Sequence, residues 1–297
     1  MTHDPRPFGR LLTAMVTPFA PDGSLDVEGA AKLATYLVDE QRNDALVVSG
    51  TTGESPTTTD AEKETLLRAV VDAVGDRARI VAGVGTNNTA HTIELAHAAE
   101  KAGAHGLLVV TPYYNKPPQA GVAQHFLTVA DAAGLPVMVY DIPHRAGTAI
   151  ATETMCRIAE HERIVAVKDA KGDLTASSWV LSRTDLAYYS GDDAATLPLL
   201  SIGGVGLVGT STHFTGVLAK DMIEAFERGD NAAALALHRR AMPLFTGIFR
   251  APGTMLVKAG LNASGRPAGP VRSPLVEATA DELAQLRTDA AAAGIGL

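Results

Sequence analysis

The chain has 297 residues, of which 46% are hydrophobic, and a formal net charge of −8 at pH 7. The length fits one large α/β domain or a barrel with an addition. The acidic charge is spread along the chain and disfavours a nucleic acid or an anionic membrane surface as a partner. A single cysteine excludes an intrachain disulfide, and we recognise neither a leader peptide nor an apolar run long enough to span a bilayer. We therefore expect a soluble, cytoplasmic protein without nucleic-acid or membrane partners.

Short apolar runs alternate with amphipathic stretches along most of the chain. The apolar runs are Leu11–Val16, Ala45–Val48, Arg79–Val84, Gly106–Val110, Pro136–Tyr140, Ile164–Val167, Leu186–Tyr189 and Val205–Val208. Helical spacing of apolar residues is found between them, in Val27–Asp39, Ala61–Val74, Thr89–Lys101, Val122–Ala133 and Ala194–Ser201. Eight repeats of strand and helix predict an α/β fold, a closed (β/α)8 TIM barrel. An open, doubly wound sheet is the alternative.

The pattern changes after the eighth unit. From about Asn231 we expect helices alone. They are an alanine-rich helix through Phe249, a helix over Gly253–Gly260 and, after a loop rich in Gly and Pro, a helix over Asp281–Ala293. This tail is too long to be the last barrel helix. We predict a catalytic barrel in residues 1–230 and a C-terminal helical domain in residues 231–297.

The segment Gly204–Gly209 matches the G-x-G-x-x-G pattern of dinucleotide-binding sites. In those sites the glycines follow a strand and open a helix, whereas here they lie inside the eighth apolar run. We expect these glycines to let the backbone approach a ligand or a neighbouring element instead.

Lys168 directly follows the sixth apolar run, in Ile164-Val165-Ala166-Val167-Lys168-Asp169. Active sites of barrels lie at the carboxyl ends of their strands. Burial at such a place lowers the pKa of a lysine and leaves a neutral amine that can attack a ketone. For this segment alone, a lysine that extends its ammonium group into water is the alternative interpretation. Lys171 lies beyond the strand and is expected to remain a solvated cation.

Other predicted strand ends also carry polar groups. After the second run, Thr51 and Thr52 stand between glycines, in a turn whose exposed amides suit a carboxylate; helix capping is the alternative. After the fourth and fifth runs come Tyr114, on a loop stiffened by prolines, and Tyr140 with Arg145, whose guanidinium suits bidentate carboxylate binding. Together with the lysine, these groups suit a carbonyl acid as substrate.

Two aspartates, Asp192 and Asp193, follow the seventh run, in a region where many barrels bind phosphate. Their charge would repel a phosphate, so we expect a substrate that is not phosphorylated. Together with His213 they could form a carboxylate–histidine metal site. No spacing motif supports such a site, and we expect no metal.

Five motifs stand at these strand ends in order: Gly50-Thr51-Thr52-Gly53-Glu54-Ser55, Thr111-Pro112-Tyr113-Tyr114-Asn115, Tyr140-Asp141-Ile142-Pro143-His144-Arg145, Val167-Lys168-Asp169 and Ser190-Gly191-Asp192-Asp193. They resemble the signatures of the dihydrodipicolinate synthase / N-acetylneuraminate lyase family. The resemblance covers essentially the whole chain and is strongest to the synthase branch, in its actinobacterial form. It implies a lyase that condenses pyruvate with L-aspartate 4-semialdehyde to 4-hydroxy-tetrahydrodipicolinate, in lysine and diaminopimelate biosynthesis.

The resemblance also implies catalytic roles. Lys168 forms the Schiff base with pyruvate, and Tyr140 moves protons to and from the imine and the carbinolamine. Thr51 links Tyr140 to Tyr114, which reaches in from a neighbouring subunit. The implied assembly is a homotetramer built from dimers.

The same resemblance implies which residues bind the substrates. Thr52 holds the carboxylate of pyruvate, and Arg145 takes the carboxylate of L-aspartate 4-semialdehyde. Gly191 and the carbonyl of Val208 complete the pocket wall. No cofactor is implied other than the covalent imine on Lys168, and no metal.

Some residues depart from the family pattern and bear on the aldehyde acceptor. His144 stands where a small residue is usual, Asp141 where asparagine is common, and Val208-Gly209-Thr210 where an Ile-Ser-Val-type segment is frequent. The nearest alternative is therefore a related pyruvate-dependent aldolase or lyase that acts on a sugar acid or another aldehyde; Arg145 favours the synthase. A barrel retained as a regulator or binding protein is disfavoured, because the lysine, the tyrosine and both threonines are present.

L-lysine inhibits many members of the family at a cleft between subunits. At the places where lysine-sensitive enzymes carry histidines, this chain has Asp60 and Lys63. His91 replaces a glutamate whose carboxylate would pair with the cationic group of bound lysine. Asn87 and Tyr113 are the same residues as in the lysine-sensitive enzymes. Because unpaired charges in a small polar cleft are costly, we expect L-lysine to inhibit weakly or not at all.

Overall fold

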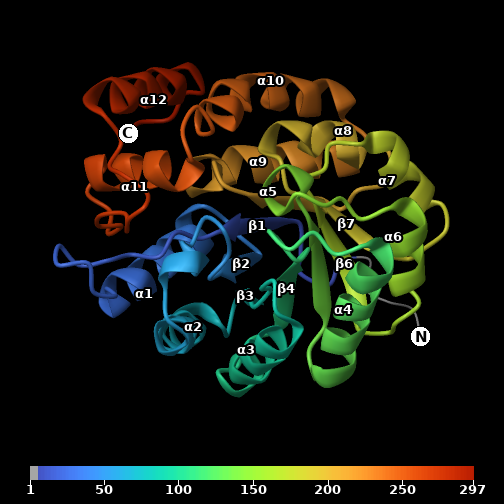
Figure 1. Cartoon of the computed structure of the whole chain (residues 1–297). Coiled ribbons are helices and arrows are strands. Elements are labelled where there is room, and N and C mark those ends of the chain that lie inside the picture. Colours follow the sequence, from blue (N-terminus) through green and yellow to red (C-terminus); the bar gives the residue numbers. More distant parts are fainter. Residues whose placement is uncertain (1–5) are drawn as a thin grey trace.

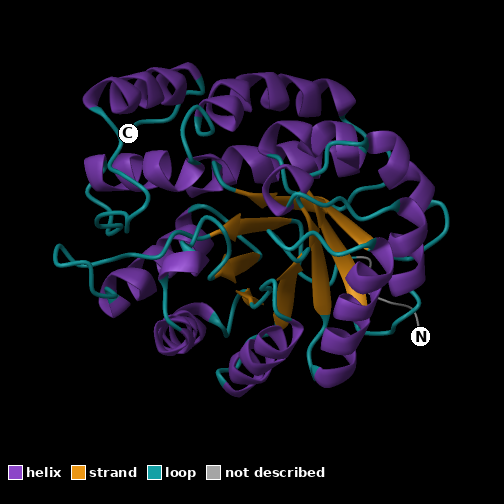
Figure 2. Ribbon diagram, in the orientation of Figure 1, coloured by secondary structure: helices purple, strands orange, loops and turns teal. Residues whose placement is uncertain are grey.

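The computed structural model describes residues 6–297 and contains a closed barrel of parallel strands surrounded by helices (Figures 1 and 2). The strands pair in chain order, and β8 closes onto β1. The strands are β1 (Leu11–Ala14), β2 (Ala45–Val48), β3 (Arg79–Gly83), β4 (Gly106–Val110), β5 (Val137–Asp141), β6 (Ile164–Asp169), β7 (Ala187–Ser190) and β8 (Gly206–Gly209). The prediction of a (β/α)8 barrel is confirmed, and the open sheet is excluded.

Helices form the outer ring and the C-terminal part of the chain (Figure 1). They are α1 (Val27–Thr35), α2 (Asp60–Val74), α3 (Thr89–Lys101), α4 (Gln119–Ala132), α5 (Pro143–Ala146), α6 (Thr152–Ile158), α7 (Leu174–Leu181), α8 (Thr196–Leu200), α9 (Thr212–Glu227), α10 (Asn231–Gly247), α11 (Gly253–Ala263) and α12 (Ala280–Ala292). Tighter or wider helical turns occur at η1 (Tyr36–Glu40), η2 (Ser55–Thr57) and η3 (Asp193–Ala195). Within residues 6–297, a helix both long and apolar enough to cross a membrane is not found.

The strands are short and apolar because both of their faces are buried, as is usual in parallel sheets. Along β2, Val47 points into the barrel and lies in the inner apolar cluster with Met138 of β5. Its neighbours Leu46 and Val48 point outward, into the larger cluster beneath the helices. The alternation of side chains along each strand therefore divides the core into an interior and an outer layer.

The first helix is shorter than the sequence predicts. The stretch Val27–Asp39 was expected to form one helix, but α1 ends at Thr35, and η1 follows as a π-helical turn. In η1 the hydroxyl of Tyr36 donates to the carbonyl of His213 in α9 at 2.9 Å and accepts a hydrogen bond from Gln41 at 3.0 Å. The bond to His213 is a tertiary contact, which the periodicity of the local sequence cannot predict.

The C-terminal helices pack against the barrel (Figure 1). Ala241 and Phe245 of α10 share an apolar cluster with Leu218 and Met222 of α9, while α12 contacts both α10 and α11. The predicted C-terminal helical part is present. A domain boundary at residue 230 stays a prediction, since this shared core extends across it.

The glycine-rich segment lies in β8, as expected. A Cβ atom on Gly206 would stand 2.1 Å from the carbonyl oxygen of Arg10, an oxygen that accepts a hydrogen bond from the amide of Leu207 at 2.9 Å. The glycine therefore permits close packing where β8 meets the residue before β1.

We predict that Gly206→Ala destabilises the fold by about 1–3 kcal/mol, because the added methyl group meets a backbone oxygen that cannot move aside. Gly296→Ala is the control, since a Cβ there meets nothing within 4 Å. Thermal or denaturant unfolding of both variants measures the difference. Equal stability of the two would contradict the packing role of Gly206.

Candidate active site

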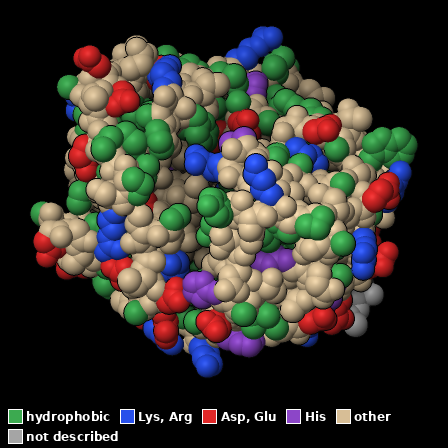
Figure 3. All heavy atoms as spheres, in the orientation of Figure 1, with side chains coloured by type: hydrophobic (Ala, Val, Ile, Leu, Met, Phe, Trp, Pro, Cys, Tyr) green, Lys and Arg blue, Asp and Glu red, His purple; other side chains and the backbone are tan. Residues whose placement is uncertain are grey.

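A cleft with a volume of about 870 Å³ opens at the carboxyl ends of the barrel strands. It lies between the barrel and the segment joining α10 to α11, and Figure 3 shows the surface hollowed there. Six residues of the predicted site line it: Thr51, Thr52, Tyr140, Arg145, Lys168 and Gly191. The cleft thus gathers residues from four strand ends that are far apart in the sequence.

Lys168 lies inside β6, not beyond it, and only 5% of the residue is exposed. Its Nζ atom stands 4.3 Å from the centre of the Tyr140 ring, because β5 and β6 pair with these two residues opposite each other. Burial lowers the pKa of Lys168 to about 8; the charge of Asp193 opposes this shift, and that of Arg145 adds to it. At pH 7 about a tenth of the amine is therefore neutral, far more than for a solvated lysine. The snorkelling alternative is wrong, since the amine is buried.

Tyr140 is buried beside the lysine. Burial raises the pKa of its phenol to about 12, although the charge of Arg145 and a hydrogen bond with Thr51 act in the opposite direction. The phenol therefore keeps its proton at neutral pH and is available as a proton donor. The hydrogen bond between Thr51 and Tyr140 is one half of the expected link, and its continuation to Tyr114 stays a prediction.

The turn after β2 is held in an unusual backbone conformation. Ser49 and Glu54 both have positive φ angles, of 60° and 56°, which non-glycine residues seldom adopt. Between them, Thr52 is buried, and its hydroxyl lies 3.4 Å from the hydroxyl of Thr210. The turn places its threonines at the cleft wall instead of using them as helix caps.

Arg145 and Gly191 stand at two further strand ends. Arg145 belongs to the one-turn helix α5, which follows β5 and ends at Gly147 with φ 75°. It is exposed to the cleft, where it can reach a carboxylate. Gly191 follows β7, and a Cβ atom there would lie 3.0 Å from Cγ of Lys168. The absence of a side chain at Gly191 therefore makes room for the lysine stem.

Two predicted site residues do not line the cleft. Val208 packs in the inner apolar cluster of the barrel; Thr210, two residues further on, lines the cleft in its place. Tyr114 is 88% exposed and has a positive φ of 72°. Its predicted position in the site of a neighbouring subunit stays a prediction.

Asp193 and His213 form hydrogen bonds that hold the loop after β8. The carboxylate of Asp193 is fully buried and accepts hydrogen bonds from the amides of Thr210 and Ser211 and from the Ser211 hydroxyl. His213 binds the Thr210 carbonyl at 2.8 Å through Nδ1, and its Nε2 accepts the amide of Val16 at 3.2 Å. Burial lowers the pKa of His213 to about 4. Both ring nitrogens are thus engaged, and among residues 6–297 no three His, Cys, Asp or Glu side chains gather as metal ligands would.

The expectation that Lys171 remains solvated is wrong. Its side chain is 15% exposed, and Nζ lies 3.6 Å from Oδ2 of the buried Asp141. Burial raises the pKa of Asp141 to about 6, and the charge of Lys171 opposes this shift. Asp141 is the last residue of β5, and Lys171 lies two residues after the adjacent β6. Sequence reasoning missed the pair because 30 positions separate the two residues in the chain.

The residues expected to weaken binding of L-lysine form their own contacts. Nε2 of His91 lies 2.9 Å from Oδ2 of Asp60, which joins the starts of α2 and α3. Lys63 donates to the carbonyl of Thr58 at 2.5 Å. Weak inhibition by L-lysine stays a prediction.

A closed parallel barrel with a buried lysine beside a phenol, at the carboxyl ends of its strands, defines a class of protein. It is a (β/α)8 barrel of the imine-forming, aldolase-like type. Comparison with known proteins identifies the family within this class.

The model of the dihydrodipicolinate synthetase family matches residues 7–293, and the chain belongs to this family. A 4-hydroxy-tetrahydrodipicolinate synthase of Acidothermus cellulolyticus is 71% identical over 98% of this chain and 94% of its own. A synthase of Streptomyces coelicolor is 60% identical over 98% of this chain and 97% of its own. The crystal structure of the Cyanidioschyzon merolae enzyme with lysine bound superposes with a TM-score of 0.94 at 44% identity, covering 97% of this chain and 99% of that one. The resemblance noted in the sequence is confirmed.

We predict that imine formation with pyruvate, trapped by borohydride, accelerates as the pH rises towards the Lys168 pKa of about 8. Below that pKa the neutral amine increases about 10-fold per pH unit, so the initial rate should rise from pH 6 and level off near pH 9. Mass analysis of the trapped peptide identifies the labelled lysine. Lys171→Ala is the control and should still be labelled, whereas Lys168→Ala should not. A midpoint above about 10, the range of a solvated lysine, or label on Lys171 would contradict the assignment.

Proposed function

We propose that this chain condenses pyruvate with L-aspartate 4-semialdehyde to give 4-hydroxy-tetrahydrodipicolinate, a step of lysine and diaminopimelate biosynthesis. The observation that carries the proposal is the buried Lys168 amine, 4.3 Å from the ring centre of Tyr140. The 71% identity to the Acidothermus synthase supports this choice of substrates.

The reaction begins at Lys168. Its neutral amine attacks the ketone carbon of pyruvate, and the carbinolamine loses water to form the imine. Tyr140 donates and accepts the protons that these steps require. Loss of a methyl proton gives an enamine, which attacks the aldehyde carbon of the second substrate. The amino group of that substrate then attacks the imine carbon and displaces Lys168 as the ring closes. No cofactor or metal is needed beyond the covalent imine.

Carboxylate recognition is divided between two sides of the cleft. Thr52, with its hydroxyl and the amides of the turn, holds the carboxylate of pyruvate. Arg145 binds the carboxylate of the semialdehyde in a bidentate geometry. Gly191 leaves room for the lysine stem. The family resemblance also assigns the carbonyl of Val208 to the pocket wall, although the side chain of Val208 packs in the inner apolar cluster and Thr210 lines the cleft.

The proton relay continues through Thr51 to Tyr114 of a second subunit. The exposure of Tyr114 supports this arrangement, because 88% of the residue is available to another chain. We propose a homotetramer built from dimers, in which each dimer exchanges these tyrosines. The cytoplasmic location remains an expectation from composition.

A related aldolase or lyase acting on a sugar acid is the second candidate function. The exposed His144, which lines the cleft beside Arg145, is the observation that favours a different acceptor. Arg145 favours the semialdehyde, because an aldehyde without a carboxylate has no use for a guanidinium there. A panel of aldehydes with and without a carboxylate, offered to the enzyme with pyruvate, separates the two functions.

We predict that Arg145→Ala lowers kcat/KM for L-aspartate 4-semialdehyde roughly 100-fold, because a charge-assisted bidentate contact is lost. Borohydride trapping with pyruvate alone should proceed nearly as in the unmodified enzyme. An aldehyde without a carboxylate is the matched control substrate. If its turnover falls by the same factor, Arg145 does not recognise the acceptor.

We predict that mixing inactive Tyr114→Phe protein with inactive Lys168→Ala protein restores part of the activity. A hybrid dimer contains one site with both an intact Lys168 and an intact Tyr114 from its neighbour. Turnover is followed while subunit exchange is verified by mass spectrometry of the assemblies. Exchange without recovery would place Tyr114 in the site of its own subunit.

A further inference from the structure

Glu54 is a charged residue of the turn after β2, and it is buried against the C-terminal part of the chain. Its side chain is 1% exposed, and Oε1 lies 2.6 Å from Nζ of Lys258 in α11, whose side chain is fully buried. Its other oxygen accepts the backbone amide of Arg272 at 2.8 Å. Both oxygens of this carboxylate are therefore occupied by residues beyond position 250.

Lys258 and Arg272 are themselves held tightly. Nζ of Lys258 donates to the carbonyl of Pro270 at 2.7 Å. Nζ of Lys258 and Cζ of Arg272 lie 4.1 and 4.0 Å from the centre of the Phe19 ring, within the range of cation–π attraction. Helix α11 and the loop that follows it thus pack over Phe19, in the loop after β1, and supply the two partners of Glu54.

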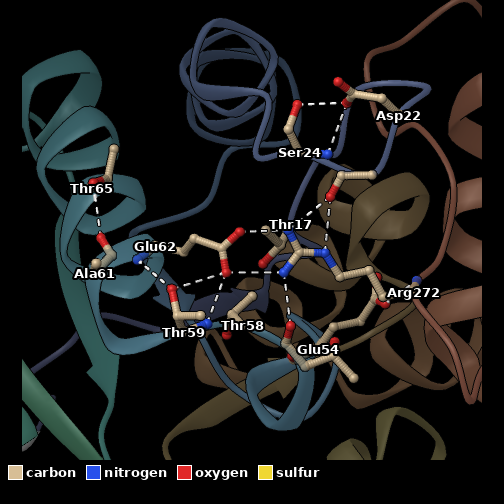
Figure 4. Close-up of polar contacts among 12 residues, drawn as sticks. Thr17, Asp22, Ser24, Glu54, Thr58, Thr59, Ala61, Glu62, Thr65 and Arg272 are labelled. Atoms are coloured by element: carbon tan, nitrogen blue, oxygen red, sulfur yellow. Dashed lines mark hydrogen bonds and ion pairs between the residues drawn. The ribbon is translucent and has the colours of Figure 1, made fainter.

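The side chain of Arg272 ties this loop to the segment after the turn. Its guanidinium donates to both carboxylate oxygens of Glu62 at 3.0 and 2.5 Å and to the carbonyl of Thr57 at 2.7 Å (Figure 4). It also donates to the carbonyl of Gly23 at 3.0 and 2.8 Å. Figure 4 shows the guanidinium between Glu62 and the chain around Glu54.

The turn that carries Thr51 and Thr52 lies beyond the last residue of β2, so no strand pairing fixes it. The carbonyl of Thr52 accepts the hydroxyl of Thr254 in α11 at 3.2 Å, and the carbonyl of Gly53 accepts the hydroxyl of Thr17 at 2.6 Å. Glu54 has a left-handed backbone conformation, which costs energy for a non-glycine residue and persists only where the surroundings impose it. Contacts of α11 and the following loop therefore help to set the shape of this turn.

We propose that Glu54, Lys258 and Arg272 form a positioning unit through which the C-terminal part of the chain holds the Thr51–Thr52 turn in the geometry that binds the keto-acid carboxylate. None of the three needs to touch the reacting atoms. The inference rests on the proposed function, because it assumes that this turn binds the carboxylate of pyruvate. Loosening the unit should weaken pyruvate binding more than it slows the chemistry on Lys168.

The test uses the double variant Glu54→Gln/Lys258→Met, which removes both buried charges together and leaves neither unpaired. The half-saturating pyruvate concentration is measured twice, in borohydride trapping and in turnover. We expect it to rise about 10-fold, equivalent to 1.4 kcal/mol, while kcat stays within about 3-fold. Thr254→Val is a milder second variant that removes the hydroxyl bound to the Thr52 carbonyl, and it should raise the same concentration by a smaller factor.

The matched control is the ion pair of Lys220 with Asp44 at the opposite end of the barrel. Lys220 is also buried, and Asp44 accepts the amides of Arg10 and Leu11, at 2.6 and 3.0 Å, where β1 begins. Asp44→Asn/Lys220→Met should lower the melting temperature as the first double variant does, yet leave half-saturation within about 2-fold, because distant sites act independently.

Two results would overturn the proposal. One is an unchanged half-saturating concentration in both the Glu54/Lys258 double variant and Thr254→Val; the other is an equal rise in the control. Failure of the proposed function can be distinguished from failure of this inference, because it would already be observed in the unmodified enzyme. If that enzyme forms no imine with pyruvate, the proposed function is wrong, and the positioning of the turn loses its purpose.

Discussion

The candidate site depends on the register in which β5, β6 and β7 pair. Tyr140 lies opposite Lys168, and Lys168 lies opposite Tyr189. Because side chains alternate along a strand, the lysine shares its face with Ala166, whose side chain lies in the barrel interior beside Met138. A slip of one residue in β6 would turn Asp169 inward and place the amine beneath the helices. Closure of the barrel in chain order prevents that slip, since each strand is paired on both sides.

Each end of the barrel has a buried lysine paired with a carboxylate, and the two pairs constrain different parts. At the amino ends of the strands, Asp44 and Lys220 join the start of β1 to α9. At the carboxyl ends, Glu54 and Lys258 join the turn after β2 to α11. In the fully buried pair of Glu54 and Lys258, removing one partner costs about 3–5 kcal/mol, although an intact pair contributes little net stability compared with apolar residues. The main role of the two ion pairs is therefore to fix the relative positions of the segments that they join.

The fold could be predicted from the sequence because buried parallel strands and amphipathic helices leave clear apolar patterns. Strand ends were less certain: Lys168 and Asp169 look like the start of a loop, yet both belong to β6, where Asp169 accepts a hydrogen bond from Ser177. The residues of the cleft were found through motifs at strand ends. Partners far away in the chain were not found. Glu54 resembles an ordinary turn residue, and the amide that binds it comes 218 positions later, a separation at which no local pattern carries information.

Burial of Lys168 also determines which changes the site tolerates. Burial lowers the pKa of its amine to about 8, and much of that burial comes from residues with no chemical part in the reaction, such as the apolar residues of the barrel interior. A substitution that admits water to the lysine would raise its pKa towards that of a solvated lysine without altering any catalytic group. A substitution that packs the shell more tightly would extend reactivity into more acidic solution. The pH range in which such an enzyme works therefore depends on the unreactive residues that surround the lysine. Substitutions among these residues can shift that range gradually while the reacting residues stay the same.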